Sequence, residues 1–316
     1  MLLSAIIPSY NEEQVIEESY RRLTSVLGKM DIDSYELLFI NDGSCDKTLD
    51  ILKGLAGKDE HVRILSFSRN FGHQAAVSAG LNECRGDVAI IIDADLQDPP
   101  EVIPEMLRIR ETEKCNVVYG VRIKRKGESF FKRWTARLYY RLINYLSDVP
   151  FPIDTGDFRL VDRQIIDVFN RLPEKNKYIR GLISWVGFKQ CPVYYERDAR
   201  FAGTTKYPLR KMLHFASIGV FYFSKKPLRL ATNIGFISIL AGLILALWLF
   251  FDVTFGNARV VTGWTSTIII IVFFGGVQLL TIGVLGQYIG SLFDEAKNRP
   301  DYIIDEKIND QDSGLS

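Results

Sequence analysis

The segment that decides the fold reads VAIIIDADLQDPP and spans residues 88–100. Its first five residues are apolar, which is typical of a strand buried on both faces, and carboxylates follow directly. Because Mg²⁺ and Mn²⁺ prefer carboxylates together with substrate phosphate oxygens, Asp93 and Asp95 are candidate metal ligands. The alternative is that this motif only caps a helix starting near Glu101. Two carboxylates at the end of a buried strand nevertheless need a partner.

Apolar runs alternate with helical patterns on both sides of this segment. The runs typical of buried strands cover residues 2–8, 35–41, 62–67, 87–93 and 116–121. The helical patterns between them cover residues 12–27, 46–55, 73–82 and 101–113. This alternation is typical of βαβ units and predicts an α/β domain with a mainly parallel sheet. Ligands of such sheets bind at the carboxyl ends of the strands.

Polar residues cluster at those predicted strand ends. The first three runs are followed by SYNEE (9–13), NDGS (41–44) and SRNFGH (68–73). No G-x-G-x-x-G follows the first run, and no G-x-x-x-x-G-K-[ST] occurs anywhere in the chain. The two commonest phosphate-binding loops are therefore absent. We predict that His73, after a glycine, is a hydrogen-bond partner at a helix start rather than a metal ligand.

The composition excludes several classes of protein. The chain has 316 residues and a net charge of +1, so no strong field favours a nucleic-acid partner. A hydrophobic fraction of 47% excludes a disordered chain. The first eight residues lack a basic segment, so no cleavable secretory signal is expected. No two cysteines form a C-x-x-C pair, and we predict reduced thiols in a cytosolic domain for Cys45, Cys84, Cys115 and Cys191.

Two charge-free segments near the C-terminus predict membrane-spanning helices. Residues 230–251 fit one crossing, and residues 260–293 fit one crossing at about 266–289 with an extended end. Lys and Arg lie before the first segment and after the second, whereas the connection holds only Arg259. This bias predicts that the N-terminal domain and the C-terminal tail are both cytoplasmic. The charged tail, residues 301–316, is expected to be solvated and mobile.

Small residues share one face in each of these apolar segments. In the second segment Gly276, Gly283 and Gly290 recur every seven residues. Such faces allow close helix packing in lipid. They are explained either by packing of the two helices on each other or by an additional contact between protomers, so a homo-oligomer stays open.

The strand-end motifs resemble those of a known family. The stretches PSYNEE (8–13), NDGS (41–44) and DADLQDP (93–99) resemble family-two inverting glycosyltransferases of the GT-A fold. The stretches DTGDFRL (154–160) and RFAGTTKY (200–207), with two C-terminal apolar helices, resemble polyprenyl-phosphate glycosyltransferases. That group includes bactoprenol glucosyltransferases and dolichol-phosphate mannose synthases. The resemblance covers roughly residues 2–295.

The resemblance implies a nucleotide-sugar donor, with UDP-glucose expected before UDP-N-acetylglucosamine or GDP-mannose, and a bound Mg²⁺ or Mn²⁺. Asp42 would hold the base or ribose, and Asp93 and Asp95 the sugar and the metal-bound diphosphate, with Asp93 also catalytic. The residues implied to bind the donor are Pro8, Tyr10, Glu12, Asp42, Asp93 and Asp95. The expected domains are a GT-A domain (1–207), a juxtamembrane amphipathic helix (208–229), a two-helix membrane domain (230–293) and a cytosolic tail (294–316).

The acceptor implied by the resemblance is a polyprenyl phosphate in a bacterial plasma membrane. Its phosphate is already an anion at neutral pH, so a strong general base is less necessary than for a hydroxyl acceptor. Asp157 matches the family's candidate base, and it is assigned to base or acceptor positioning; a structural ion pair to Arg159 or Arg163 is the alternative. Cations that could hold the acceptor phosphate are Arg122, Lys124, Arg125, Lys126, Arg200 and Lys206.

The basic and aromatic segments of the chain allow more than one role. The basic cluster at residues 122–126 could instead attract the chain to anionic lipid. Basic amphipathic patterns at residues 130–145 and 208–226 predict helices in the membrane interface, or ordinary core-facing helices. Trp185 could line an acceptor path or lie in the core.

Three functions compete. The expected one is inverting transfer of one sugar to a polyprenyl phosphate. A processive polysaccharide synthase would share the domain, but no Q-x-x-R-W motif occurs. The third is a non-catalytic membrane-anchored partner with a decayed transferase domain, against which the intact carboxylates argue.

Overall fold

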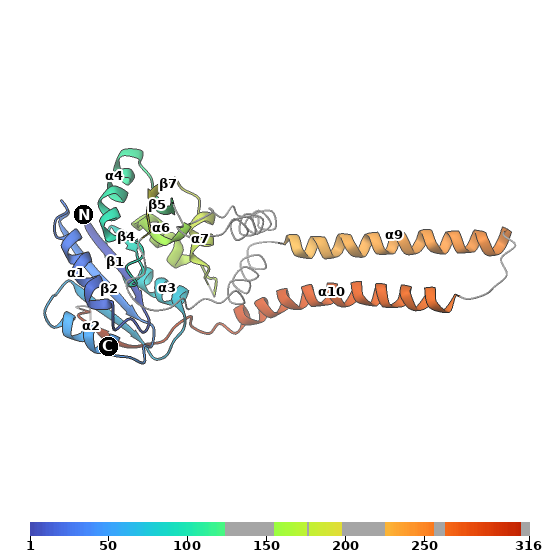
Figure 1. The fold of residues 1–316 in the computed structure, drawn as a ribbon, viewed down its shortest axis with the longest axis horizontal. Helices are drawn as coiled ribbons and strands as arrows, with labels where there is room; N and C mark the ends of the chain where they lie inside the picture. Colours follow the sequence, from blue (N-terminus) through green and yellow to red (C-terminus); the bar gives the residue numbers. More distant parts are fainter. Residues whose placement is uncertain (124–154, 176, 198–224, 256–262, 311–316) are drawn as a thin grey trace. The chain divides into compact units, whose positions relative to one another are not determined.

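The computed structural model describes residues 1–123, 155–175, 177–197, 225–255 and 263–310. These residues fall into two compact units. One unit holds the sheet together with residues 299–310, and the other holds two long helices. Figure 1 shows the elements of each.

The first unit is built on one mixed eight-stranded sheet. The strand order is β7-β5-β6-β4-β1-β2-β3-β8. Pairs β1–β2, β1–β4, β2–β3 and β5–β7 are parallel, whereas β4–β6, β5–β6 and β3–β8 are antiparallel. The mainly parallel α/β sheet is therefore confirmed. The strands are β1 (Leu2–Ser9), β2 (Ser34–Asn41), β3 (Val62–Phe67), β4 (Val88–Ile91), β5 (Val117–Arg122), β6 (Thr155–Asp162), β7 (Gln190–Tyr195) and β8 (Ile304–Ile308).

Helices cover both faces of the sheet (Figure 1). One face carries α1 (Ile16–Leu27), α2 (Thr48–Ala56) and α4 (Ile103–Glu113), whose buried side chains share a single core with the strands. The other face carries α3 (His73–Glu83), α6 (Arg163–Arg171) and α7 (Ile179–Trp185). The parallel strands are mainly apolar, as is typical of a sheet buried on both faces, and the charged exceptions Glu36 and Arg63 pair with each other.

Three of the predicted helices begin later than their sequence patterns indicate, including α2, which begins at Thr48 rather than at residue 46. The first begins at Ile16 because the Glu12 carbonyl accepts the amides of Val15 and Ile16 in a turn. The helix expected from residue 101 starts as a short 3₁₀ turn, Pro100–Val102, and becomes α-helical at Ile103. Neither this 3₁₀ turn nor the α-helix after it has a side-chain hydrogen bond at its N-cap. Helix capping therefore does not explain Asp93 and Asp95.

Residues 304–308 form an edge strand of the sheet, and the expectation of a solvated, mobile tail is wrong for residues 304–310. β8 pairs antiparallel with β3 at the sheet edge. Asp310 accepts hydrogen bonds from Arg63 and Arg85, each at 2.8 Å, and lies 3.4 Å from the Lys307 ammonium. Arg63 is itself buried and pairs with buried Glu36 at 2.6 Å. The tail was missed because its partners lie more than 200 residues earlier in the chain.

This ion-pair cluster gives a pH-dependent prediction for Asp310→Asn. Burial opposes ionisation of Asp310, but the hydrogen bond and charge of Arg63, with Lys307, hold its pKa below the ordinary value. Because the folded-state pKa is the lower one, this stabilisation is present above the unfolded pKa of about 3.9 and is lost as pH falls. At pH 7 the variant should exchange its β8 amides about 5- to 30-fold faster than wild type, as expected for about 1–2 kcal/mol.

Hydrogen exchange of the detergent-solubilised protein measures this effect. The matched control is Asp305→Asn, an exposed carboxylate on the same strand, which should leave exchange unchanged. Equal exchange in Asp310→Asn and wild type at pH 7 would show that the cluster does not hold the tail.

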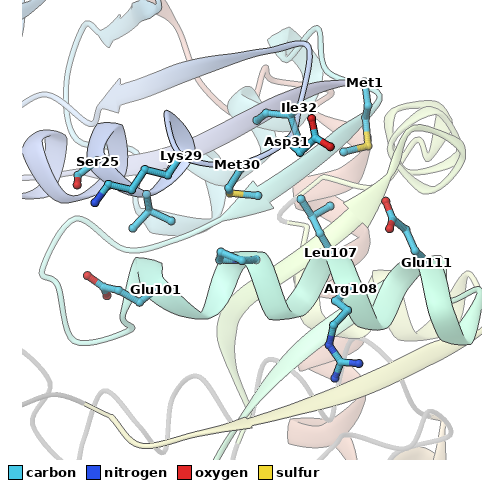
Figure 2. A pocket seen from close by; sticks show the side chains of 12 residues that line it. Met1, Ser25, Lys29, Met30, Asp31, Ile32, Glu101, Leu107, Arg108 and Glu111 are labelled. Carbon is cyan, nitrogen blue, oxygen red and sulfur yellow. The ribbon is translucent and has the colours of Figure 1, made fainter.

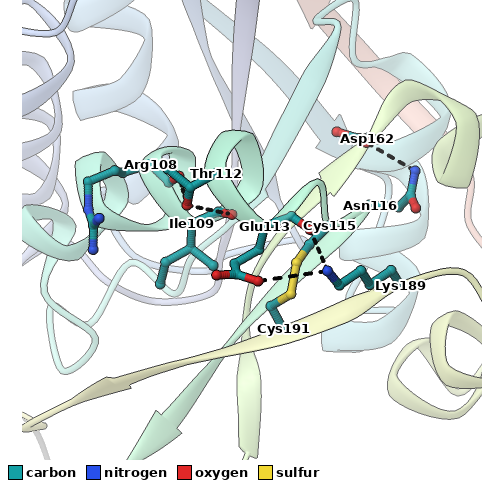
Figure 3. Close-up of a disulfide and its surroundings, with 9 residues drawn as sticks. All are labelled: Arg108, Ile109, Thr112, Glu113, Cys115, Asn116, Asp162, Lys189 and Cys191. Atoms are coloured by element: carbon teal, nitrogen blue, oxygen red, sulfur yellow. Dashed lines mark hydrogen bonds and ion pairs between the residues drawn. A yellow bond between two sulfur atoms is a disulfide. The ribbon is translucent and has the colours of Figure 1, made fainter.

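Two cysteines are joined by a disulfide, so the prediction of four reduced thiols is wrong for this pair. Cys115 and Cys191 are bridged, with their Cα atoms 6.1 Å apart. Figure 3 shows the bridge beside the Glu113–Lys189 ion pair. Parallel pairing of β5 with β7, which places Cys191 opposite Val118, brings these distant segments together. Cys45 and Cys84 are free, as predicted.

The second unit consists of helices α9 (Lys226–Phe255) and α10 (Trp264–Ala296), which pack on each other. Both are longer than predicted. By length and composition, Lys226–Leu245 and Ile270–Ala296 could each cross a membrane. On α9, Ala231 and Ser238 are buried. On α10, a Cβ added at Gly276, Gly283 or Gly290 would meet no atom of the described residues within 4 Å, so packing against α9 does not account for the small residues on this face.

Candidate active site

The strand-end loops meet at one edge of the sheet, here called the carboxyl edge, where β1, β2 and β4 end. Ser9 lies opposite Asn41 in the β1–β2 register, and the amide of Asp42 donates to the Ser9 carbonyl at 2.9 Å. Asn11 joins the first loop to the second: its amide donates to Ser44 Oγ at 3.0 Å, and its side-chain oxygen accepts the Cys45 amide at 2.8 Å. These hydrogen bonds join the loop after β1 to the loop after β2.

Asp42 is buried and enclosed by the loop that follows β3. Its carboxylate accepts hydrogen bonds from the amides of Phe71 (2.7 Å) and Gly72 (2.9 Å) and from the Asn70 side chain (3.0 Å). Burial raises the pKa of Asp42, while these backbone donors act in the opposite direction. The buried carboxylate therefore holds the loop at residues 70–72 in place through these hydrogen bonds.

Gly43 is the point where this arrangement tolerates no side chain. Its φ is +61°, and a Cβ there would lie 2.6 Å from Asn70 N and closer still to the Arg69 carbonyl carbon. Gly43→Ala should therefore destabilise the protein by about 1–3 kcal/mol through left-handed strain and displacement of the loop.

Gly54→Ala is the matched control for this substitution. Gly54 lies inside α2 with open space around it, so alanine there should be neutral or stabilising by about 0.5–1 kcal/mol. Thermal unfolding of both variants measures the contrast. Equal unfolding temperatures would contradict the steric argument.

Asp157 meets Asp93 because β6 runs antiparallel to β4. Ile91 lies opposite Arg159, so continuing this register two residues outward brings Asp93 and Asp157 together. His73, the first residue of α3, lies between them: Nε2 is 3.1 Å from Asp157 Oδ2 and Nδ1 is 3.8 Å from Asp93 Oδ1. The histidine begins a helix as predicted, but its ring contacts these carboxylates.

Arg180 is the strongest partner of Asp157. It donates through Nε at 2.6 Å and Nη2 at 3.0 Å, one to each carboxylate oxygen. Gln74 of α3 positions α7 by accepting the Ile179 amide at 3.0 Å. The predicted alternatives are wrong: Arg159 donates to the Gly156 carbonyl, and Arg163 donates to backbone carbonyls at residues 84 and 86. No feature of the sequence around Arg180 pointed to this role.

The charges of this cluster are strongly coupled. Burial opposes ionisation of Asp157, but Arg180 and His73 hold its pKa well below the ordinary value. Burial alone would lower the pKa of His73, and the charges of Asp93 and Asp157 raise it to about 9. Burial raises the pKa of Asp93 to about 6, with Asp157, Asp95 and Asp98 adding to the effect and His73 opposing it. The cluster around Asp93 and Asp157 is thus acidic, with Arg180 and His73 already engaged by Asp157.

Asp93 and Asp95 have the chemistry of a divalent-metal site completed by substrate. Their neighbouring carboxylates repel one another, and about a third of the Asp93 side chain is exposed. Asp95 Oδ1 accepts the Gln97 amide at 3.1 Å, which orients the carboxylate. Within the described residues no three metal-ligating side chains are grouped together. The pair fits Mg²⁺ or Mn²⁺, since such ions accept one or two carboxylates plus phosphate oxygens.

Asp98, which the sequence did not single out, is buried beside these residues. It accepts the Tyr195 hydroxyl at 2.5 Å and lies 3.5 Å from Arg122 and 3.4 Å from Arg197. Burial, with the Asp98 charge, raises the pKa of Tyr195 above its usual range. Arg122 is thus oriented at the carboxyl edge, and Arg197 is a further cation there.

The other predicted phosphate-binding residues lie outside the described residues; they are Lys124, Arg125, Lys126, Arg200 and Lys206. The amphipathic helix predicted at residues 130–145 also lies outside them, as do residues 208–224 of the amphipathic helix predicted at 208–226.

The remaining predicted donor residues lie on the first strand and its loop. Pro8 is buried in β1, and the Tyr10 side chain is exposed. The Glu12 amide donates to Thr48 Oγ1 at 2.9 Å, which joins this loop to the start of α2. Trp185 is 57% exposed, so the core alternative for this residue is wrong.

A separate cavity of about 580 Å³ lies between α1 and α4 (Figure 2). Met1, at the start of β1, lines it together with Lys29, Glu101 and Arg108. It is therefore at the opposite end of β1 from Ser9, and it contains none of the predicted site residues.

The mixed α/β sheet with its acidic carboxyl edge, together with the family comparisons, defines a GT-A-type glycosyltransferase that uses a nucleotide sugar. The family model of glycosyl transferase family 2 matches residues 4–169, and the chain belongs to this family. A Bacillus subtilis relative, uncharacterized glycosyltransferase YkcC, is 49% identical over 99% of this chain and 96% of its own. The prophage bactoprenol glucosyl transferase homolog of Escherichia coli is 40% identical over 96% of this chain and 98% of its own.

Among solved structures, the chain also matches the Mycobacterium tuberculosis glucosyl-3-phosphoglycerate synthase, crystallised with Mn²⁺, UDP-glucose and phosphoglyceric acid. The TM-score is 0.44 at 22% identity, over 70% of this chain and 77% of that one.

Proposed function

We propose that this protein transfers a single sugar from a nucleotide donor to a polyprenyl phosphate, with inversion at the anomeric carbon. The observation that carries the proposal is the length of the similarity to the bactoprenol glucosyl transferase homolog. It covers 96% of this chain, and therefore extends beyond the transferase family match into the two apolar helices. UDP-glucose is the proposed donor on the same ground.

The donor is proposed to bind along the carboxyl edge. Pro8, Tyr10 and Glu12 are proposed to line the nucleotide pocket. Asp42 shapes the base and ribose end by holding the loop at residues 70–72. Asp93 and Asp95 would hold Mg²⁺ or Mn²⁺, which when bound neutralises charge on the diphosphate leaving group.

Asp157 is proposed to orient groups rather than to remove a proton. Its tight pairing with Arg180 and His73 keeps it anionic. A carboxylate with so low a proton affinity is a poor general base. The acceptor phosphate needs none, because it is already an anion near neutral pH. The proposed work of Asp157 is therefore to hold Arg180 and His73 where the donor and acceptor anions meet.

Cations near the carboxyl edge are proposed to offset the repulsion between the acceptor phosphate and the donor diphosphate. Arg122 is proposed for this role with Lys124, Arg125, Lys126, Arg200 and Lys206. Asp98 and Tyr195 orient the Arg122 guanidinium, which supports a role for Arg122 in binding the acceptor phosphate.

The proposed topology is two-pass, with the transferase unit and the C-terminal tail in the cytoplasm. Pairing of β8 with β3 supports it, because strands of one sheet lie on one side of a membrane and the chain between them must cross an even number of times. The Lys and Arg residues flanking the apolar helices support the cytoplasmic side. We further propose that two protomers contact each other through the α10 face that carries Gly276, Gly283 and Gly290, because small residues allow helices to pack closely in lipid.

A lipid-transfer assay tests the proposed function. Purified full-length protein in detergent is given undecaprenyl phosphate, Mg²⁺ and a panel of labelled UDP- and GDP-sugars. The expected result is label in the organic phase from UDP-glucose, abolished by EDTA. Transfer only from another donor would correct the sugar, and polymer formation would favour a processive synthase. No nucleotide binding by folded protein would overturn the proposal.

A further inference from the structure

We propose that the C-terminal segment completes the donor site, and that Tyr302 is a positioning residue for the loop that encloses Asp42. The inference rests on the proposed function only in taking this loop as part of a nucleotide site. The transferase family match ends at residue 169, far before this segment.

The direction of β8 brings Tyr302 to the carboxyl edge. β8 runs antiparallel to β3, so its first residue, Ile304, lies opposite Phe67, the last residue of β3. Just before it, the Ile303 carbonyl accepts the Ser68 amide at 3.1 Å. The tail thus pairs with the chain up to the first residue of the loop at 68–72.

An aromatic stack continues this contact. The Tyr302 ring lies parallel to Phe67, with centroids 5.1 Å apart and planes at 11°. The Asn82 side chain of α3 donates to the Tyr302 hydroxyl at 3.0 Å, which anchors the ring. Phe67 in turn meets Phe71 edge-on, with centroids 5.8 Å apart. Such pairs are worth more than their buried area alone.

Phe71 connects the stack to the site. Its amide donates a hydrogen bond to the Asp42 carboxylate at 2.7 Å. The Arg69 guanidinium lies over its ring in a cation–π contact, 4.0 Å from the ring centroid. His73, two residues further, contacts Asp157 and lies near Asp93. The loop therefore connects Asp42, at the proposed nucleotide-binding part of the site, with Asp93 and Asp157, where the sugar transfer is proposed to occur. Tyr302 supports it from outside by fixing Phe67.

The test compares Tyr302→Ala with Tyr302→Phe in the full-length protein. The first removes the ring, whereas the second keeps the stack and loses only the hydrogen bond to Asn82. UDP affinity is measured with Mg²⁺ by calorimetry, and exchange of the Phe71 and Gly72 amides by hydrogen–deuterium exchange. We expect Tyr302→Ala to weaken UDP binding about tenfold, the size of one lost stack, and to speed exchange of both amides. Tyr302→Phe should stay within about twofold of wild type, since an exposed hydrogen bond contributes little.

Unchanged UDP affinity and unchanged exchange in Tyr302→Ala would overturn the inference. A merely structural role would lower the unfolding temperature and leave the affinity of the folded fraction unchanged, which also overturns it. If Tyr302→Ala does not fold, Tyr302→Leu is measured by the same criteria. Failure of wild-type protein to bind UDP or GDP would instead count against the proposed function, and the amide exchange would still decide whether Tyr302 holds the loop.

Discussion

Asp93→Asn and Asp95→Asn are each expected to lower sugar transfer by roughly a thousandfold, because each removes a charge proposed to hold the metal on the leaving diphosphate. Asparagine keeps the size of the side chain, and both residues lie at a strand end rather than inside the core, so the fold should persist. The measurement is initial rate with saturating donor and acceptor, alongside thermal unfolding.

The control for these two variants is Asp50→Asn, an exposed carboxylate on α2, which should retain full activity. Raising the Mn²⁺ concentration should partly restore Asp95→Asn, since a weakened metal site is filled by mass action. Normal turnover in either Asp93→Asn or Asp95→Asn would remove the proposed metal site.

Asp157→Asn is expected to lower kcat by about a hundredfold while UDP affinity changes little. The variant leaves Arg180 and His73 without their shared anion, and both would move from the positions they hold now. Because Asp157 and Arg180 act through one ion pair, the double variant with Arg180→Gln should be little worse than either single one.

The pH–rate profile separates the two roles open for Asp157. A positioning role predicts that the rate of Asp157→Asn falls as pH rises from 7 to 9, because losing the Asp157 charge lowers the pKa of His73 from about 9 and the imidazolium is then lost earlier. A general base predicts a rate that rises with pH in the variant, as hydroxide replaces the base. Asp167→Asn on α6, an exposed carboxylate paired with Arg163 at 3.9 Å, is the control and should keep wild-type kinetics.

Most of the parallel half of the sheet could be predicted from local patterns. Each buried strand from β1 to β5 reads as an apolar run, and the polar residues after the runs meet because parallel strands end at the same edge. Helix starts were less accurate, since a turn at Glu12 delays α1 without changing its apolar face.

The partners within the site could not be predicted in the same way. Asp157 was found through its motif, but its neighbours depend on the antiparallel register of β6 against β4 and on the docking of α7 against α3. His73 carried no motif of its own, and Arg180 lies in a short helix with no distinctive pattern. The disulfide and the docked tail were wrongly predicted because each joins segments that no local signal connects.

The sequence by itself therefore determined the α/β class, the two apolar helices and the acidic strand ends, because periodicity and local composition specify how a segment is buried. Only the tertiary structure decided that Arg180 and His73 flank Asp157 and that Tyr302 reaches the loop around Asp42. These contacts arise from strand order and register, which depend on the free energy of the whole packed sheet rather than on any one segment.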